Sequence, residues 1–116
     1  MCCALAEAKK AGQSGEVPVG CVIVHENEIV ASAGNSCIKD NSPLRHAEVN
    51  AIEIACKKAK NYRLTDHIMF VTLEPCHMCC MAIVHARIKK VYFSLIEPKS
   101  GAVSYTHLRA HETQSD

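Results

Sequence analysis

The spacing of apolar positions divides the first part of the chain into one helix and two strands. Residues 1–11 carry apolar side chains at helical intervals and are followed by Gly12, a pattern that predicts a short helix. Residues 17–24 are rich in β-branched side chains and predict a buried strand. A polar break at Glu26 separates that strand from a second one over residues 28–33. The two strands are therefore expected to form a hairpin.

The second part of the chain alternates helices with strands. The pattern predicts a helix over residues 45–58, a strand over 66–74, a helix over 75–85 and a strand over 88–95. Pro75 suits the first turn of a helix, because its missing N–H has no partner to lose there. The order helix, hairpin, helix, strand, helix, strand predicts an α/β layer fold with helices packed on a sheet.

Length and composition narrow the classes of function. The chain has 116 residues, enough for one domain, and is 48% hydrophobic and 22% charged, which is ordinary for a globular protein. Thirteen Lys and Arg balance twelve Asp and Glu, so the chain is no polycation and any contact with nucleic acid must rest on a local patch. Aromatic residues are 4% and Trp is absent, which excludes a platform that stacks single strands on rings.

Two local basic runs are candidates for such a patch. One contains Lys57, Lys58, Lys60 and Arg63, and the other spans residues 87–90. These side chains are either solvated cations at helix ends or contacts for RNA phosphates, and both interpretations stay open.

Eight cysteines and seven histidines are unusual for this length. A disulfide scaffold would need a secretory signal, but the chain becomes charged at Glu7, too early for the apolar part of one. No apolar run approaches the roughly 18 residues of a membrane span. We therefore expect a cytoplasmic protein with reduced thiols and no membrane contact, and interpret clustered cysteines first as metal ligands.

Two short motifs, each at the start of a predicted helix, supply the candidate chemistry. His46 begins one motif, and Cys76 and Cys79 form a Cys-x-x-Cys pair in the other, thirty positions further along. Helix N-termini favour thiolates, and two sulfurs with one imidazole leave the fourth position of zinc for water, as in catalytic sites. Glu48 is placed to touch that water without being a ligand, so it is a candidate proton shuttle.

Other roles exist for each motif taken alone. A lone Cys-x-x-Cys is often a redox pair or half of a structural zinc finger, and a structural site with three or four cysteines is the main alternative here. Cys80 and His77 lie in the same turn, but the neighbours of a helical ligand point about 100° away from it. Cys21 and Cys56 fall on apolar faces, where core packing is the expected role.

The combined motifs resemble the zinc-dependent nucleoside and nucleobase deaminases. In order and spacing they are most similar to the bacterial tRNA-specific adenosine deaminases, over about residues 3–102. The stretches that carry this resemblance are Glu16–Gly20, His46–Glu48, Asn61–Leu64, Thr72–Cys79, Arg87–Ile88 and Lys99–Ala102.

The resemblance implies a cytidine-deaminase-like three-layer α/β sandwich, a mixed sheet with helices on its faces and with the final elements missing. Residues 1–102 would form a deaminase domain that is incomplete at both ends. Residues 103–116 have no family counterpart, and we expect this tail to be disordered or an artefact of read-through.

The resemblance also implies an activity, the zinc-dependent hydrolytic deamination of the wobble adenosine in a tRNA anticodon loop to inosine. The enzyme would be a homodimer with one Zn²⁺ per chain, in which Glu48 moves the proton of water to the ring nitrogen and then to ammonia. Asn35 matches a family position that contacts the nucleoside, and Val19 matches a position in the wall of the pocket. The Ala47 backbone matches a group that hydrogen-bonds the base. A turn residue after Gly34 is an equally good interpretation of Asn35.

Two alternative functions remain. The same chemistry could act on free guanine or cytosine or on dCMP, and Asn50 after the His-Ala-Glu motif is compatible with that. A structural zinc module could instead bind RNA without catalysis. Glu48 argues against the structural module, because a closed zinc site has no use for a carboxylate beside an open position.

Overall fold

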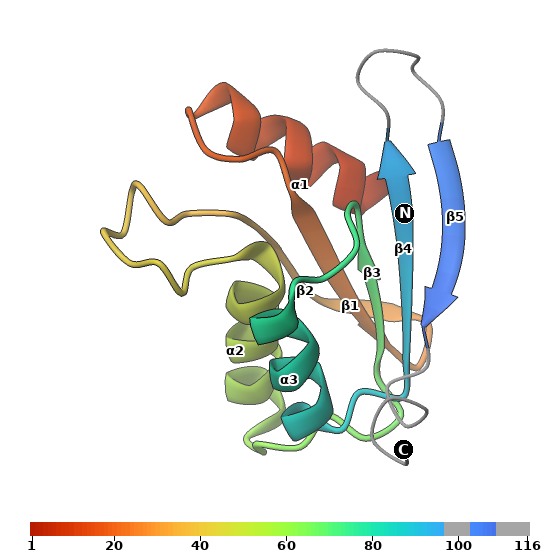
Figure 1. Ribbon diagram of the computed structural model, residues 1–116. Coiled ribbons are helices and arrows are strands. Elements are labelled where there is room, and N and C mark those ends of the chain that lie inside the picture. The colour runs from red at the N-terminus through yellow and green to blue at the C-terminus, as the bar shows by residue number, and fades with distance from the viewer. Residues whose placement is uncertain (97–102, 109–116) are drawn as a thin grey trace.

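The computed structural model describes residues 1–96 and 103–108 (Figure 1), with side-chain surroundings up to residue 94. Its elements in chain order are α1 (Cys2–Gln13), β1 (Gly20–His25), β2 (Glu28–Gly34), α2 (Ala47–Ala59), β3 (Ile68–Val71), α3 (His77–Ala86), β4 (Lys90–Ile96) and β5 (Val103–Leu108). The predicted order of helices and strands is confirmed. None of the helices within these two ranges is long and apolar enough to cross a bilayer.

The strands form one mixed sheet in the order β2-β1-β3-β4-β5. β1 pairs antiparallel with both β2 and β3, whereas β3 and β4 are parallel. The parallel pair needs a crossover connection, which α3 supplies. The predicted hairpin of β1 and β2 and the predicted mixed sheet are therefore both present.

Helices cover the sheet on both faces, so the predicted three-layer sandwich is confirmed. α1 lies on one face, and α2 and α3 lie side by side on the other (Figure 1). Alternate residues of β1 serve the two layers: Gly20 faces α1, where an added Cβ would meet Ala4 O, while Cys21 and Ile23 join the core on the opposite face. That core also contains Ala47, Ala51, Ala55, Leu64, Met69, Val71, Ile83, Ile88 and Val91.

Several element boundaries differ from the sequence prediction by a few residues, and two of these differences have clear local reasons. The third strand was predicted over residues 66–74, but Asp66 has a φ of 62°, a left-handed conformation that interrupts an extended chain, and the strand begins at Ile68. The helix predicted from Pro75 begins at His77, and Cys76 in extended conformation is its N-cap. One candidate ligand is therefore a helix cap rather than a helical residue.

The end of the chain also differs from expectation. The tail from Val103 onward was expected to be disordered or an artefact of read-through. Residues 103–108 form β5 and pair antiparallel with β4, from Ile96↔Val103 to Val91↔Leu108, while the origin of the tail stays a prediction. The expectation counted only apolar burial, whereas the edge of β4 offers backbone N–H and C=O groups to any extended segment. Residues 109–116 lie outside the described residues, as does the Lys99–Ala102 motif, and the domain boundary at residue 102 stays a prediction.

Candidate metal centre and substrate site

Three candidate ligands from two helix starts converge on one point. His46 is the N-cap of α2, Cys76 is the N-cap of α3, and Cys79 lies in the first turn of α3. Their ligand atoms all lie within 4.8 Å of one another. His46 Nδ1 is 3.6 Å from Cys76 Sγ and 3.5 Å from Cys79 Sγ. In the ranges that the structure describes, no other trio of His, Cys or acidic side chains converges in this way.

The spacing of these atoms fits zinc. Tetrahedral coordination at Zn–S ≈ 2.3 Å and Zn–N ≈ 2.0 Å separates a sulfur and a nitrogen ligand by about 3.5 to 3.6 Å. The two nitrogen–sulfur distances agree with that value. Two cysteines and one histidine also form the donor set of catalytic zinc sites that keep one coordination position open.

Glu48 lies beside the ligand cluster without being part of it. The residue is 4% exposed, belongs to the first turn of α2, and lies beside the Cys79 thiol. Burial raises the pKa of the Glu48 carboxyl, although its own backbone N–H, His46 and Cys79 each oppose that shift. A carboxyl in this setting takes up and releases a proton closer to neutral pH than an exposed one.

The Cys79 thiol differs from the sequence-based expectation. The helix N-terminus was expected to favour the thiolate, but burial, followed by the negative charge of Glu48, raises the pKa of Cys79. Desolvation therefore outweighs the helix dipole at this position. A metal ligand must give up its proton, so zinc binding here is coupled to proton release.

The other cysteines are placed as expected, and none joins the trio. The Cys80 S–H donates to the Pro75 carbonyl across 3.6 Å, away from the three ligand atoms. Cys21 is fully buried in the core, as predicted. Cys56 is half-buried and packs against the edge of the core. The prediction that the Cys80 side chain points away from the candidate metal ligands therefore agrees with the structure.

The three candidate substrate contacts are linked by hydrogen bonds. The Asn35 N–H donates to the Val19 carbonyl at 3.2 Å, and the Ala47 N–H donates to Asn35 Oδ1 at 2.7 Å. Ala47 is the first residue of α2, so its N–H has no acceptor within the helix, and Asn35 supplies one from outside. The Ala47 backbone was expected to bond a base, and its N–H is held by Asn35 in this structure.

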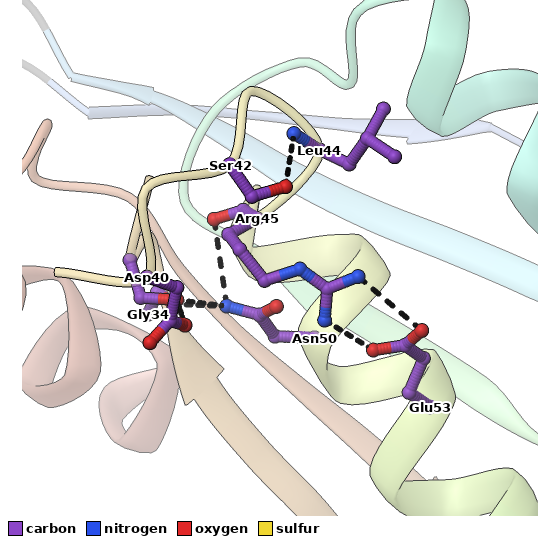
Figure 2. A network of polar contacts seen from close by, with 8 residues as sticks. Gly34, Asp40, Ser42, Leu44, Arg45, Asn50 and Glu53 are labelled. Carbon is purple, nitrogen blue, oxygen red and sulfur yellow. Dashed lines mark hydrogen bonds and ion pairs between the residues drawn. The ribbon is translucent and has the colours of Figure 1, made fainter. Parts of the chain in front are cut away.

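Two residues of this region were not identified as candidates from the sequence. Asn50 Nδ2 lies 3.0 Å from Gly34 O, 2.9 Å from Ser36 Oγ and 3.4 Å from Arg45 O (Figure 2). Asn50 follows His46 by one helical turn, a spacing that places the two on one side of α2. The second residue, Glu16, had entered only as part of a resembling stretch, and its contacts depend on a fold in which distant segments meet.

The basic runs lie far from the candidate metal centre. Lys57 and Lys58 are in the last turn of α2, and Arg87 is the C-cap of α3. Both helices begin at the metal cluster, and the 13 residues of α2 span about 20 Å. Both interpretations therefore stay open: solvated cations at helix ends, and contacts for RNA phosphates away from the reacting nucleotide.

Comparisons with known proteins agree with this geometry. Residues 1–95 match the profile described as the cytidine and deoxycytidylate deaminase zinc-binding region. The chain is 48% identical over 100 residues to a tRNA-specific adenosine deaminase of Aquifex aeolicus, covering 86% of this chain and 66% of that protein. A tRNA-specific adenosine deaminase of Bacillus subtilis is 45% identical over 98 residues, covering 84% of this chain and 61% of that protein. The chain thus spans less than two thirds of the length of these relatives.

Solved structures show the same fold. One from a study of A-to-I editing by tRNA:A34 deaminases superposes with a TM-score of 0.80 at 42% identity, covering 86% of this chain and 77% of that chain. A guanine deaminase from Bacillus subtilis gives a TM-score of 0.76 at 41% identity, covering 78% of this chain and 58% of that chain.

Proposed function

Since the chain belongs to the family of cytidine and deoxycytidylate deaminases with a zinc-binding region, we propose that it hydrolytically deaminates the wobble adenosine of a tRNA anticodon loop. The products are inosine and ammonia, formed by exchange of the C6 amino group for an oxygen from water. The identities of 48% and 45% to tRNA-specific adenosine deaminases support adenosine in tRNA as the substrate.

The observation that carries this proposal is the buried Glu48 next to three converging ligand atoms. His46, Cys76 and Cys79 would hold one Zn²⁺ per chain, which when bound makes water a stronger acid and a better nucleophile. Glu48 accepts one proton of the attacking water and delivers it to the ring nitrogen. It then transfers the proton of the newly added hydroxyl group to the amino group, which leaves as ammonia. The raised pKa of Glu48 suits a group that must both accept and donate.

Asn35, Val19 and Ala47 form the proposed nucleoside side of the site. Asn35 is hydrogen-bonded to backbone groups of both other residues, so the three act as one connected surface. Val19 is 7% exposed and supplies an apolar wall. Asn35 contacts the nucleoside, and the Ala47 backbone hydrogen-bonds the base.

A free-base deaminase is the second candidate. The guanine deaminase of Bacillus subtilis is 41% identical to this chain in a superposition with a TM-score of 0.76, close to the values for the tRNA:A34 deaminase structure. The ligand trio and Glu48 serve either substrate, because both reactions replace a ring amino group by oxygen.

Substrate competition separates the candidates. The zinc-loaded protein is incubated in parallel with an anticodon stem-loop carrying adenosine at the wobble position, the same stem-loop carrying guanosine, and free guanine, cytosine and dCMP. Ammonia release together with inosine from the first substrate alone supports the proposal. Turnover of a free base with an inert stem-loop contradicts it, and zinc binding without any turnover favours the structural module.

We also propose that the enzyme is a cytoplasmic homodimer. Large apolar side chains remain exposed near the α2 and α3 side of the molecule, among them Leu44, Ile54 and Met81, and a second copy would cover them. The eight cysteines are free thiols, as a reducing compartment requires. Light scattering should give twice the chain mass, and Met81→Lys should shift the protein toward the monomer while Lys9→Met, on α1, should not.

A further inference from the structure

Glu16 is a buried carboxylate that binds a loop of the proposed substrate site. The residue is 8% exposed and lies in the connection between α1 and β1. Its Oε1 accepts the Ile38 N–H at 3.1 Å, and its Oε2 accepts the Lys39 N–H at 2.9 Å. The two carboxylate oxygens thus accept hydrogen bonds from two consecutive backbone amides. These amides lie in the segment between β2 and α2, which we name the β2–α2 loop (residues 35–46).

Such an arrangement holds a loop firmly. Consecutive backbone N–H groups that point the same way form a concave anion-binding site, and hydrogen bonds to an ionised carboxylate are stronger than those between neutral groups. The anion here comes from the protein itself, 22 and 23 positions before its partners. Glu16 therefore joins the connection after α1 to the middle of the β2–α2 loop.

The ends of the β2–α2 loop carry the groups that matter for the site. Asn35 begins the loop and reaches Ala47 N, while His46 ends the loop as the N-cap of α2. Asn50 holds these two ends together through Gly34 O and Arg45 O (Figure 2). The middle of the loop, at Ile38 and Lys39, is held by Glu16 from the other side.

We propose that Glu16 is a positioning residue of the substrate site, which holds the β2–α2 loop in the conformation that brings the Asn35 side chain to Ala47. Glu16 touches neither the metal ligands nor the reacting atoms and acts through the loop. The consequence for activity rests on the proposed function, whereas the consequence for loop order can be measured without any substrate.

Amide hydrogen exchange gives the substrate-independent test. Ala47 is the first residue of α2, so Asn35 is the partner that protects its N–H. In Glu16→Ala the Ile38, Lys39 and Ala47 amides should all exchange faster than in the wild type. Glu7→Gln is the matched control, because Glu7 lines the same cavity as Glu16 and loses the same charge, and it should leave all three amides unchanged.

Kinetics on the anticodon stem-loop test the positioning role. With zinc content matched, Glu16→Ala should lower kcat/KM by about 10- to 100-fold, the cost of a small misplacement of a binding group. Most of the loss should appear in KM, and the pH profile of kcat should stay that of the wild type, because Glu48 is untouched. Glu16→Gln keeps one acceptor oxygen and should be intermediate, which also provides a folded variant if the alanine variant does not fold.

A double-substitution cycle decides whether Glu16 acts through Asn35. Adding Glu16→Ala to Asn35→Ala should cost little beyond Asn35→Ala alone, because the group being positioned is already absent. Additive losses, a Glu16→Ala variant with wild-type kinetics, or a loss explained by lost zinc would each overturn the proposal. If the wild type fails to act on the stem-loop, the proposed function is wrong, and unchanged exchange at Ala47 in Glu16→Ala would separately overturn the role of Glu16.

Discussion

At the scale of single residues, burial determines the chemistry of the metal centre. Glu48 and Cys79 are adjacent, almost inaccessible to solvent, and both have a raised pKa because the charged form of each is desolvated. In the absence of a metal, Cys79 therefore keeps its thiol proton, which a bound zinc ion would displace. Two substitutions separate the metal-binding role from the proton-transfer role.

Glu48→Ala should retain zinc and lose turnover by about 10²- to 10⁴-fold, the usual contribution of a positioned proton-transfer group. Glu48→Gln, which keeps the shape of the side chain, should be equally impaired. Zinc content by atomic absorption and ammonia release on the same samples give the measurement. Wild-type turnover in either variant at equal zinc content would rule out the shuttle role.

Cys79→Ser should lose both zinc and stability, because the free energies of metal binding and folding are linked in such sites. Cys80→Ser is the matched control one position away, since its sulfur bonds the Pro75 carbonyl instead of joining the trio. The measurement is zinc content and melting temperature with and without added zinc. The reverse pattern, with zinc lost only from Cys80→Ser, would show that the ligand assignment is wrong.

At the scale of elements, one contact sets how closely α1 approaches the sheet, and another joins the β2–α2 loop to α2. α1 crosses β1 at Gly20, where an added Cβ would lie 2.0 Å from Ala4 O and 2.5 Å from Ala8 N. On the other face, the Arg45 guanidinium forms a two-pronged ion pair with Glu53 and fastens the end of the β2–α2 loop to the second turn of α2 (Figure 2).

Gly20→Ala should destabilise the protein by about 1–3 kcal/mol, because the clash is with helix backbone that cannot rotate away, and α1 must shift. Gly12→Ala is the control, since the nearest contact of its added Cβ is Pro18 Cβ at 3.2 Å and alanine favours the helix. Urea unfolding monitored by circular dichroism compares them. Equal midpoints for Gly20→Ala and the wild type would contradict the close approach of α1 to β1.

The Arg45–Glu53 pair should contribute to stability at neutral pH and lose that contribution in acid. The hydrogen bond from Arg45 holds the pKa of Glu53 below its ordinary value, which means that the folded state favours the ionised carboxylate. As the pH falls and Glu53 becomes protonated, this contribution to the free energy of unfolding is lost. The Arg45 and Glu53 side chains are 25% and 49% exposed, so the effect should be small and sensitive to salt. A double-substitution cycle with Arg45→Ala and Glu53→Ala should show coupling at pH 7 that weakens as the pH falls through the lowered pKa of Glu53.

At the scale of the whole molecule, β5 forms one edge of the sheet and covers the edge of β4. Six register pairs join it to β4, although few apolar side chains were available to anchor it. Backbone hydrogen exchange should therefore show slowed amides within residues 103–108. Exchange at the rate of an unstructured peptide would instead restore the original expectation of a disordered tail.

The sequence by itself determined the order of elements and the identity of the candidate ligands. Apolar periodicity is a local property of the chain, so the hairpin, the helices and the two later strands could be predicted without knowing their partners. His46, Cys76 and Cys79 could be chosen because their motifs lie at helix starts and because zinc has strict demands on donor type.

The tertiary structure alone decided which contacts form between segments that are distant in the sequence. The roles of Glu16 and Asn50 could not be predicted, because a carboxylate or an amide has many possible partners and local patterns do not name them. The same holds for Asn35, which proved to supply the missing hydrogen bond of α2, and for β5, whose partner is an open strand edge. Desolvation of Cys79 likewise follows from the packing of α2, α3 and the sheet around it, since burial is a property of the whole fold.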